Sequence, residues 1–170
     1  MTLDDVTITG ETPADEPAIL ALHEDAFGPG RFARAAERVR EAGRHDPALS
    51  FVACRNGELL GSVRMTPIEV SSVPGHLLGP LAVKPFAKTR GIGGALIARA
   101  HAAAHEAGSA FVLLVGDRPY YERHGFEPVR GPMMPGPVDP ARLLVRWTGA
   151  HRPLSGPVRH GWVARARSDP

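Results

Sequence analysis

The segment at residues 78–96 reads LGPLAVKPFAKTRGIGGAL, a pattern that predicts a strand, a basic turn and then a helix. The apolar run ends before Pro85, and Lys88 and Arg90 place two cations in the turn. Three glycines beside them let the backbone turn tightly and come close to a ligand: Gly91, Gly93 and Gly94. Because a helix N-terminus presents free N–H groups and a partial positive charge, this segment suits a phosphate or pyrophosphate.

Two other phosphate-binding motifs do not fit this turn. A Walker P-loop ends in Gly-Lys-Ser/Thr, whereas Gly94 is followed by Ala95 and Leu96. A dinucleotide fingerprint needs G-x-G-x-x-G, and its last glycine is missing here. Glycine-rich turns also join ordinary strands to packed helices, so the glycines by themselves leave a purely structural turn open.

Two motifs in order give the chain a family resemblance. The order Lys88-x-x-Gly91-x-Gly93 resembles the acyl-coenzyme A signature (Gln/Arg)-x-x-Gly-x-(Gly/Ala) of the GCN5-related N-acetyltransferases. Residues 116–127 read GDRPYYERHGFE and resemble that family's second signature, a tyrosine followed by a charged turn and Gly-Phe. The form G-D-x-x-Y-Y-x-R-x-G-F, with L-G-P-L-A-V upstream, is similar to a bacterial subgroup of predicted acetyltransferases. The resemblance covers roughly residues 6–147.

Two positions depart from the family's pattern. Lys88 stands where the signature has glutamine or arginine, and Thr89 stands where glycine is common. Lysine keeps the positive charge but lacks the planar, bidentate geometry of arginine. The resemblance therefore implies an intact coenzyme site with a weaker contact at its first position.

The resemblance implies the acyl-CoA N-acyltransferase fold, an α/β (α+β) architecture with a mixed central sheet flanked by helices. It implies that the strands ending near Val83 and starting near Phe111 splay apart, and that acetyl-CoA, the co-substrate, lays its pantothenate arm in the gap. It also implies transfer of acetyl to a primary amine by direct attack in a ternary complex, with Tyr121 as general acid. The coenzyme-binding residues that it implies are Leu81, Ala82, Val83, Lys88, Thr89, Arg90, Gly91, Ile92, Gly93, Gly94 and Ala95.

The chemistry of such a transfer leaves the general base open. A lysine-type amine has a pKa of about 10.4 and must be neutral when it attacks. Many relatives use a glutamate on the strand before the turn, but that strand holds no acid here, so His76, Glu69 and ordered water all remain open. Tyr121 can alternatively be a core aromatic, and the chain can alternatively be a non-catalytic acyl-CoA-binding or interaction module with the same fold.

Composition fits one globular domain. The chain has 170 residues, of which 43% are hydrophobic and 22% charged, and we expect one domain over residues 1–150 with a tail at 151–170 that packs on it or is partly disordered. A net charge of +2 implies no nucleic-acid partner. The single cysteine excludes an internal disulfide, and neither a signal peptide nor a run of about 18 apolar residues is visible. We therefore expect a cytoplasmic monomer or homodimer without a membrane partner.

Apolar periodicity and turn residues predict the remaining elements. Asn56-Gly57 is a strong hairpin signal, and Pro80 predicts an irregular or bulged strand. His101 and His105 lack the glutamate of a zincin motif, so we expect surface histidines and no metal. The predicted helices cover residues 12–27, 31–41, 91–108 and 119–124, and the predicted strands cover 6–8, 51–54, 59–65 with a continuation at 68–70, 76–83 after a turn at 71–75, 111–115, 126–129 and finally 143–147.

Two loops and the tail carry further hypotheses. In the resembling family the loop between the first two helices borders the acceptor site, so residues 27–34 are expected near the substrate. The segment 127–140 holds five prolines and is expected to be either an apolar flap over that site or an ordered surface loop. The tail is basic and has Trp162 as its only aromatic residue, and we expect a loosely packed chain end there.

Overall fold

The computed structural model describes residues 1–161, apart from the side chains of residues 32 and 33. Its strands form one mixed sheet in the order β1-β2-β3-β4-β5-β8-β6, and β9 pairs with both β3 and β7. Only β4–β5 and β7–β9 run parallel within this part of the chain. The strands are β1 Thr7–Gly10, β2 Phe51–Arg55, β3 Glu58–Val70, β4 Val73–Val83, β5 Phe111–Val115, β6 Glu127–Pro128, β7 Pro132–Met133, β8 Leu143–Trp147 and β9 Gly156–His160.

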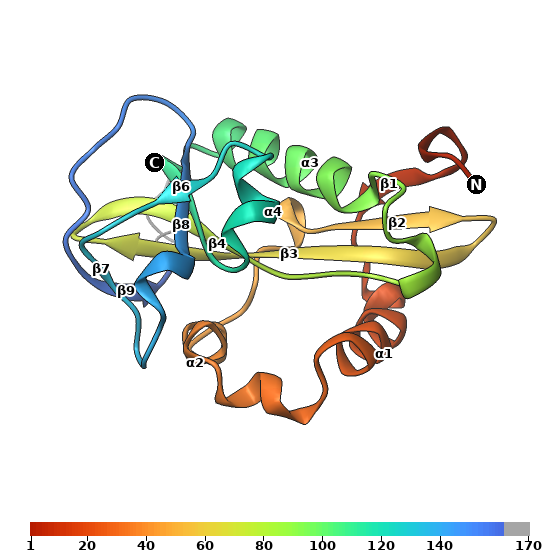
Figure 1. Ribbon diagram of the computed structural model, residues 1–170, viewed down its shortest axis with the longest axis horizontal. Coiled ribbons are helices and arrows are strands. Elements are labelled where there is room, and N and C mark those ends of the chain that lie inside the picture. The colour runs from red at the N-terminus through yellow and green to blue at the C-terminus, as the bar shows by residue number, and fades with distance from the viewer. Residues whose placement is uncertain (162–170) are drawn as a thin grey trace, which may run out of the picture.

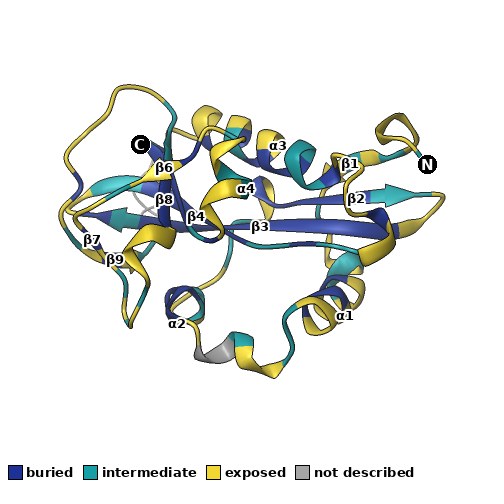
Figure 2. Ribbon diagram, viewed as in Figure 1, coloured by how far each residue is buried: buried dark blue, intermediate teal, exposed yellow. Residues whose placement is uncertain are grey.

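Helices cover both faces of the sheet (Figure 1). Helix α3 lies on one face, and α1 and α2 lie on the other. The inner sides of these helices and most of β3 are buried, whereas their outer sides face solvent (Figure 2). The α-helices are α1 Glu16–Phe27, α2 Ala35–Glu41, α3 Ile92–Glu106 and α4 Arg118–Glu122, with short 3-10 turns at Leu3–Asp5, Pro13–Asp15, Pro29–Ala33, Pro47–Leu49, Pro85–Ala87 and Pro140–Arg142.

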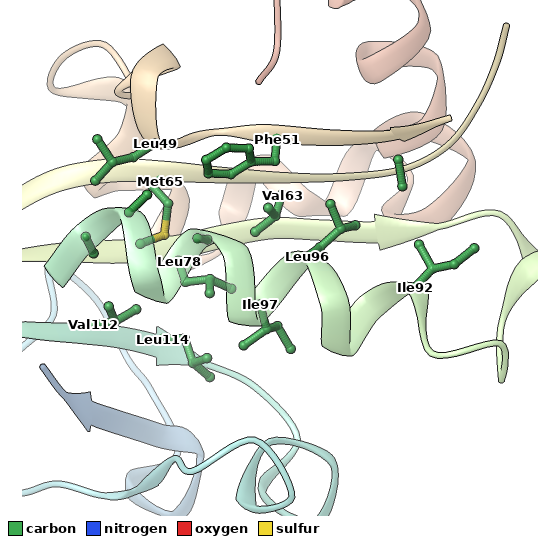
Figure 3. Packing of buried hydrophobic residues seen from close by; sticks show 14 of the residues in the cluster. Leu49, Phe51, Val63, Met65, Leu78, Ile92, Leu96, Ile97, Val112 and Leu114 are labelled. Atoms are coloured by element: carbon green, nitrogen blue, oxygen red, sulfur yellow. The ribbon is translucent and has the colours of Figure 1, made fainter. Parts of the chain in front are cut away.

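The largest core cluster lies between α3 and the sheet. Leu96 and Ile97 point from α3 toward Val63 and Met65 on β3 and Leu114 on β5 (Figure 3). Ala100 and Ala104 follow one and two turns later and are fully buried. Because alanine occupies so little space, the helix can lie close to the strands along this stripe. This packing fixes the position of the α3 N-terminus relative to the end of β4.

The centre of the sheet opens where β4 and β5 separate. The two strands pair in parallel from Gly75 to Leu77, and no β4–β5 pairing is found beyond that point in the described residues. Opposite Arg64 of β3, the register of β4 shifts at Gly79 and Pro80, so this is the bulge that the proline predicted. Beyond the bulge, β4 still pairs with β3 on its other side, and the splayed arrangement implied by the resemblance is present.

The predicted elements are found with several corrected boundaries. The second helix begins at Ala35 rather than near residue 31, because Pro29–Ala33 form a separate 3-10 turn. The turn predicted at 71–75 contains only Ser71 and Ser72, both with positive φ, so β4 starts at Val73. The third helix ends at Glu106 rather than at 108, and Ala107 beyond it is exposed. The Asn56-Gly57 hairpin is confirmed, with φ values of 50° and 79°.

The first part of the predicted tail adds a strand to the sheet. Strand β9 pairs Val158 with Val70 and His160 with Ile68, beyond the end of β2 along the same edge of β3. Leu154 and Val158 are both 5% exposed and join a second core cluster with α2 and β5. The strand at residues 143–147 is therefore not the last one. Trp162 and the arginines at 165 and 167 lie outside the described residues, and no helix within residues 1–161 is long and apolar enough to span a bilayer.

Candidate active site

A cavity of about 700 Å³ lies between the end of β4, the glycine turn and α4; we call it the turn cavity. It joins the two sequence motifs, which lie about thirty residues apart in the chain. Its walls include the turn residues Lys88 to Gly94 except Arg90, and four residues from α4 and the turn that follows it. Those residues are Tyr120, Tyr121, Arg123 and His124, whereas Glu122 does not line the cavity.

The turn cavity ends at the N-terminus of α3. Ala95 N–H is the first to close the helix, onto the carbonyl of Gly91, so the preceding amide groups remain available to a ligand. Gly91 has φ +82°, a conformation that favours glycine. A Cβ at Gly93 would lie 2.4 Å from the Tyr120 hydroxyl oxygen, so a side chain there would fill the cradle. These features fit a phosphate group bound by backbone amides and by Lys88.

The β4 side of the turn cavity offers free backbone groups. Lys84 N–H donates to the Leu60 carbonyl on β3 at 2.8 Å. Because antiparallel neighbours alternate between bonded and non-bonded pairs, the peptide groups of Val83 and Leu81 point away from β3 and toward the gap beside β5. An extended ligand chain in that gap can pair with them as an additional strand would.

Tyr121 is held in one orientation by its neighbours. A Cβ at Gly116 would lie 2.4 Å from its ring, so glycine is needed for the ring to pack there. The ring also meets Phe126 edge-on, with centroids 5.8 Å apart, and Tyr120, with centroids 4.9 Å apart. The short helix that carries both tyrosines is capped by Asp117, which accepts a hydrogen bond from Tyr120 N–H.

The electrostatic surroundings of Tyr121 keep its hydroxyl protonated. Burial raises the pKa of Tyr121 to about 12, and neighbouring Tyr120 and Asp117 act in the same direction. The guanidinium groups of Arg40 and Arg142 oppose this rise in pKa. The phenol is therefore a proton donor, not a base, throughout the neutral range.

A second cavity of about 440 Å³ adjoins Tyr121 on its other side; we call it the arginine cavity. It is lined from three directions: by the α1–α2 connection, by the β4 bulge and by the proline-rich segment. Phe27, Arg31 and Arg34 contribute from the first. Pro137 to Asp139 contribute from the proline-rich segment. Tyr121 lines both this cavity and the turn cavity.

A third cavity of about 700 Å³ lies under α1 and shares Arg31, Glu37 and Arg40 with the arginine cavity. Its floor carries Arg64, which donates from Nε to Glu11 at 3.1 Å and also pairs with Glu16. His23 lines it as well and is 4% exposed, and its Nε2 makes no hydrogen bond within the described residues. Burial, followed by the charges of Arg64, Arg40 and Arg31, lowers the pKa of His23 to about 4.

Not every residue proposed from the sequence lines these cavities. Ala82 packs toward α1, so only its backbone faces the gap, and Arg90 and Ala95 lie outside the turn cavity. The two candidate bases, His76 and Glu69, line none of the three cavities. His76 is fully buried, with Nε2 3.7 Å from an Asp46 carboxylate oxygen.

The structure adds residues that sequence reasoning missed. Arg123 and His124 belong to the second motif and line the turn cavity, so the motif itself carried the signal for them. Arg40 and Arg142 come from segments without a motif, and only the fold brings them beside Tyr121. Within residues 1–161, no cluster of three or more His, Cys, Asp or Glu side chains is arranged to hold a metal ion.

Comparison with known proteins gives the same family from independent matches. A model described as an acetyltransferase (GNAT) domain matches residues 46–128. The protein named Uncharacterized N-acetyltransferase YjhQ, from Escherichia coli (strain K12), is 33% identical over 135 residues, which cover 77% of this chain and 75% of that protein. Uncharacterized N-acetyltransferase YhbS, from the same strain, is 32% identical over 120 residues, covering 69% of this chain and 71% of that protein.

Two solved structures share the fold and contain coenzyme. The Escherichia coli YhbS structure in complex with CoA has a TM-score of 0.77 and 26% identity, covering 92% of this chain and 90% of that one. A GNAT acetyltransferase of Brucella melitensis in complex with acetyl-CoA has a TM-score of 0.67 and 27% identity, covering 92% and 96%. The chain therefore belongs to the GNAT family of acetyltransferases, and both the predicted family and the predicted fold class are confirmed.

Proposed function

We propose that this chain transfers the acetyl group of acetyl-CoA to a primary amine, by direct attack in a ternary complex. The observation that carries the proposal is the position of Tyr121, which borders both the turn cavity and the arginine cavity. A group that protonates the leaving thiolate must reach the thioester sulfur, which in a ternary complex lies where the coenzyme and the acceptor meet. The CoA and acetyl-CoA complexes of the two structural relatives support the turn cavity as the coenzyme site.

In this proposal, the glycine turn binds the pyrophosphate through backbone amides at the α3 N-terminus and through Lys88. The outward-facing peptide groups of Leu81 and Val83 pair with the pantothenate arm. Acetyl-CoA supplies the acetyl group as a thioester. The proposed coenzyme site also includes Thr89, which lines the turn cavity, and keeps Ala82, Arg90 and Ala95 as neighbours in the chain whose side chains lie outside it.

Each chemical requirement then falls to a group of this chain. The amine enters from the arginine cavity in its neutral form and attacks the carbonyl carbon, so a C–N bond forms. The Val83 N–H, which faces the gap, stabilises the carbonyl oxygen as it gains negative charge. As the C–S bond breaks, Tyr121 gives its proton to the departing thiolate. The proton lost by the amine leaves to solvent, and Tyr121 regains a proton from solvent.

One observation favours a second function. Strand β4 carries no acidic residue, so the glutamate base used by many relatives has no counterpart there. A non-catalytic acyl-CoA-binding module with the same fold would not need one. The two functions differ in turnover but agree on coenzyme binding, and an experiment must therefore measure both.

The test combines thermal unfolding with release of free CoA thiol. Acetyl-CoA at 100 times its dissociation constant should add about 2.7 kcal/mol to the free energy of unfolding, which for a chain of this size raises Tm by about 5–11 °C. Thiol release over a panel of primary amines should exceed the rate without amine. A shift in Tm without amine-dependent release would favour the binding module, and the absence of any shift would refute both.

A further inference from the structure

Arginine dominates the charge of the arginine cavity. Four guanidinium groups line it, against two carboxylates: Arg31, Arg34, Arg40 and Arg142, with Glu37 and Asp139. Apart from Tyr121, these are the ionisable groups that face it. A positive excess of this kind, in a hollow with partly apolar walls, attracts anions and repels cations.

The two carboxylates are already engaged by the protein. Glu37 accepts a hydrogen bond from Arg40 Nη1 at 3.1 Å, and Asp139 caps a 3-10 turn by accepting from Ala141 N–H at 3.0 Å. Arg34 lies 5.5 Å from the centroid of the Phe27 ring. Throughout the described chain, neither Arg34 nor Arg142 forms an ion pair with a carboxylate.

The position of these arginines matters as much as their number. Arg142 and Tyr121 line the same cavity, and the charge of Arg142 acts to lower the pKa of Tyr121. Arg34 lines the same cavity from the chain that connects α1 to α2. A volume of about 440 Å³ suits a molecule of the size of an amino acid or a dipeptide.

We propose that the acceptor is a small amine that also carries an anion, a carboxylate or a phosphate, which Arg34 and Arg142 bind while the amine faces Tyr121. This inference rests on the proposed function and names the substrate class of the same site. Guanidinium groups recognise both anions through paired, charge-assisted hydrogen bonds. Polyamines and other polycations are correspondingly excluded by repulsion from the arginines.

The same arginines help with the missing base. A nearby positive charge disfavours the ammonium form of a bound amine and so lowers its pKa. Once the anionic group has brought the acceptor into the cavity, its amine is therefore deprotonated more readily than in water. A carboxylate on β4 would instead raise the pKa of the amine, and it would help only by accepting the proton itself.

Matched acceptor pairs test the inference directly. Phenylalanine against phenethylamine and ornithine against putrescine differ only in a carboxylate, and phosphoethanolamine against ethanolamine tests a phosphate. We expect kcat/KM to be about 10- to 100-fold higher for at least one anionic member over its partner, the range of one charge-assisted contact. A preference within the first two pairs would indicate a carboxylate, and a preference within the third pair would indicate a phosphate.

Variants assign the preference to the two arginines. In Arg34→Gln and Arg142→Gln, the ratio of kcat/KM within the preferred pair should fall toward one, mainly through KM for the anionic member. Arg152→Gln removes another exposed arginine, which does not line the cavity, and should preserve the ratio. A ratio unchanged in both cavity variants would overturn the assignment.

The remaining outcomes separate this inference from the proposed function. Equal or better turnover of the non-anionic members would overturn the inference and leave the acetyltransferase in place. If no amine is turned over, thermal unfolding of the CoA-saturated protein with each amine gives the second measurement. Stabilisation by anionic members alone supports the inference while counting against catalysis. No difference within any pair overturns it.

Discussion

The hydroxyl of Tyr121 can be removed without changing the packing of its ring. Tyr121→Phe keeps the contacts with Gly116 and Phe126. We expect coenzyme binding to be retained and turnover to fall by about 10²–10⁴, the usual range for one general acid. Thiol release with the identified acceptor measures turnover, and the Tm shift with acetyl-CoA measures binding.

Tyr120→Phe is the matched control for that experiment. Its hydroxyl points at Gly93 in the turn cavity and does not line the arginine cavity, so its loss should lower turnover far less. Equal turnover in Tyr121→Phe and the parent, with chemistry rate-limiting, would rule out the general-acid role. Equal losses in both variants would indicate a shared packing duty.

His23 makes the stability of the fold depend on pH. Its pKa is about 4 in the folded chain and about 6.5 when unfolded, because burial and three nearby arginines disfavour the charged ring. Between these two pKa values the unfolded chain binds more protons than the folded chain. The contribution of His23 to the free energy of unfolding is therefore fully present above pH 6.5 and is lost as the pH falls toward 4. The loss attributable to this ring is about 1–3 kcal/mol.

His23→Gln removes the titration and should flatten the acid side of the stability curve. Urea unfolding at pH 7.5, 6.0, 5.0 and 4.5 gives the free energy of unfolding of parent and variant. The difference in free energy of unfolding between the parent and His23→Gln should change steadily from pH 7.5 to pH 4.5. His105→Gln, on the exposed side of α3, should follow the parent. Parallel curves for the parent and His23→Gln would show that the ring titrates normally.

At the scale of the element, the N-terminus of α3 decides coenzyme binding. Gly93→Asp adds both bulk and a negative charge to the first turn of this helix. We expect it to abolish most of the rise in Tm produced by acetyl-CoA, because the carboxylate competes with the pyrophosphate for the same amide groups. Gly149→Asp is the control, since nothing lies within 4 Å of its Cβ position and the residue is exposed.

Steric and charge effects at Gly93 can be separated through Tyr120. An alanine Cβ would lie 2.4 Å from the Tyr120 hydroxyl oxygen but 3.7 Å from the ring carbon that bears it. Gly93→Ala should therefore weaken the acetyl-CoA shift in Tm, and adding Tyr120→Phe should restore it. If the double variant shows no larger rise in Tm with acetyl-CoA than Gly93→Ala, contact with the Tyr120 hydroxyl is not the cause of the weakened binding.

At the scale of the whole molecule, β9 lies within the tail predicted at residues 151–170 and pairs with β3 and β7. We propose that residues 1–161 unfold as one cooperative unit, because Leu154 and Val158 join the core cluster of α2 and β5. A chain ending at residue 150 should lose several kcal/mol relative to one ending at 161, since each large buried side chain contributes about 1.5–3 kcal/mol. Calorimetry of the two chains measures the difference. Equal Tm values would place β9 outside the cooperative unit.

The local signals in the sequence were sufficient for most of the sheet and for its flanking helices. Asn56 and Gly57 predict a hairpin because few residues tolerate their positive φ. Pro80 predicts a bulge because it cannot donate a ladder hydrogen bond. The predicted starts of α2 and β4 were wrong because short turns replace part of the predicted helix and shorten the predicted loop. The observed elements begin at Ala35 and Val73. Strand β9 gave little signal because its pairing with β3 joins segments almost ninety residues apart.

The amino-acid sequence by itself determined the family, the fold class and the anion-suited turn, because each depends on residues close together in the chain. Only the tertiary structure decided what stands around Tyr121. Arg34 and Arg40 belong to α2 and its N-cap, whereas Arg142 lies about a hundred residues later, and their shared cavity exists because α2 and the proline-rich segment pack against the β4 bulge. Burial likewise raised the pKa of Tyr121 and lowered that of His23, and burial follows from the packing of distant elements rather than from neighbours in the chain.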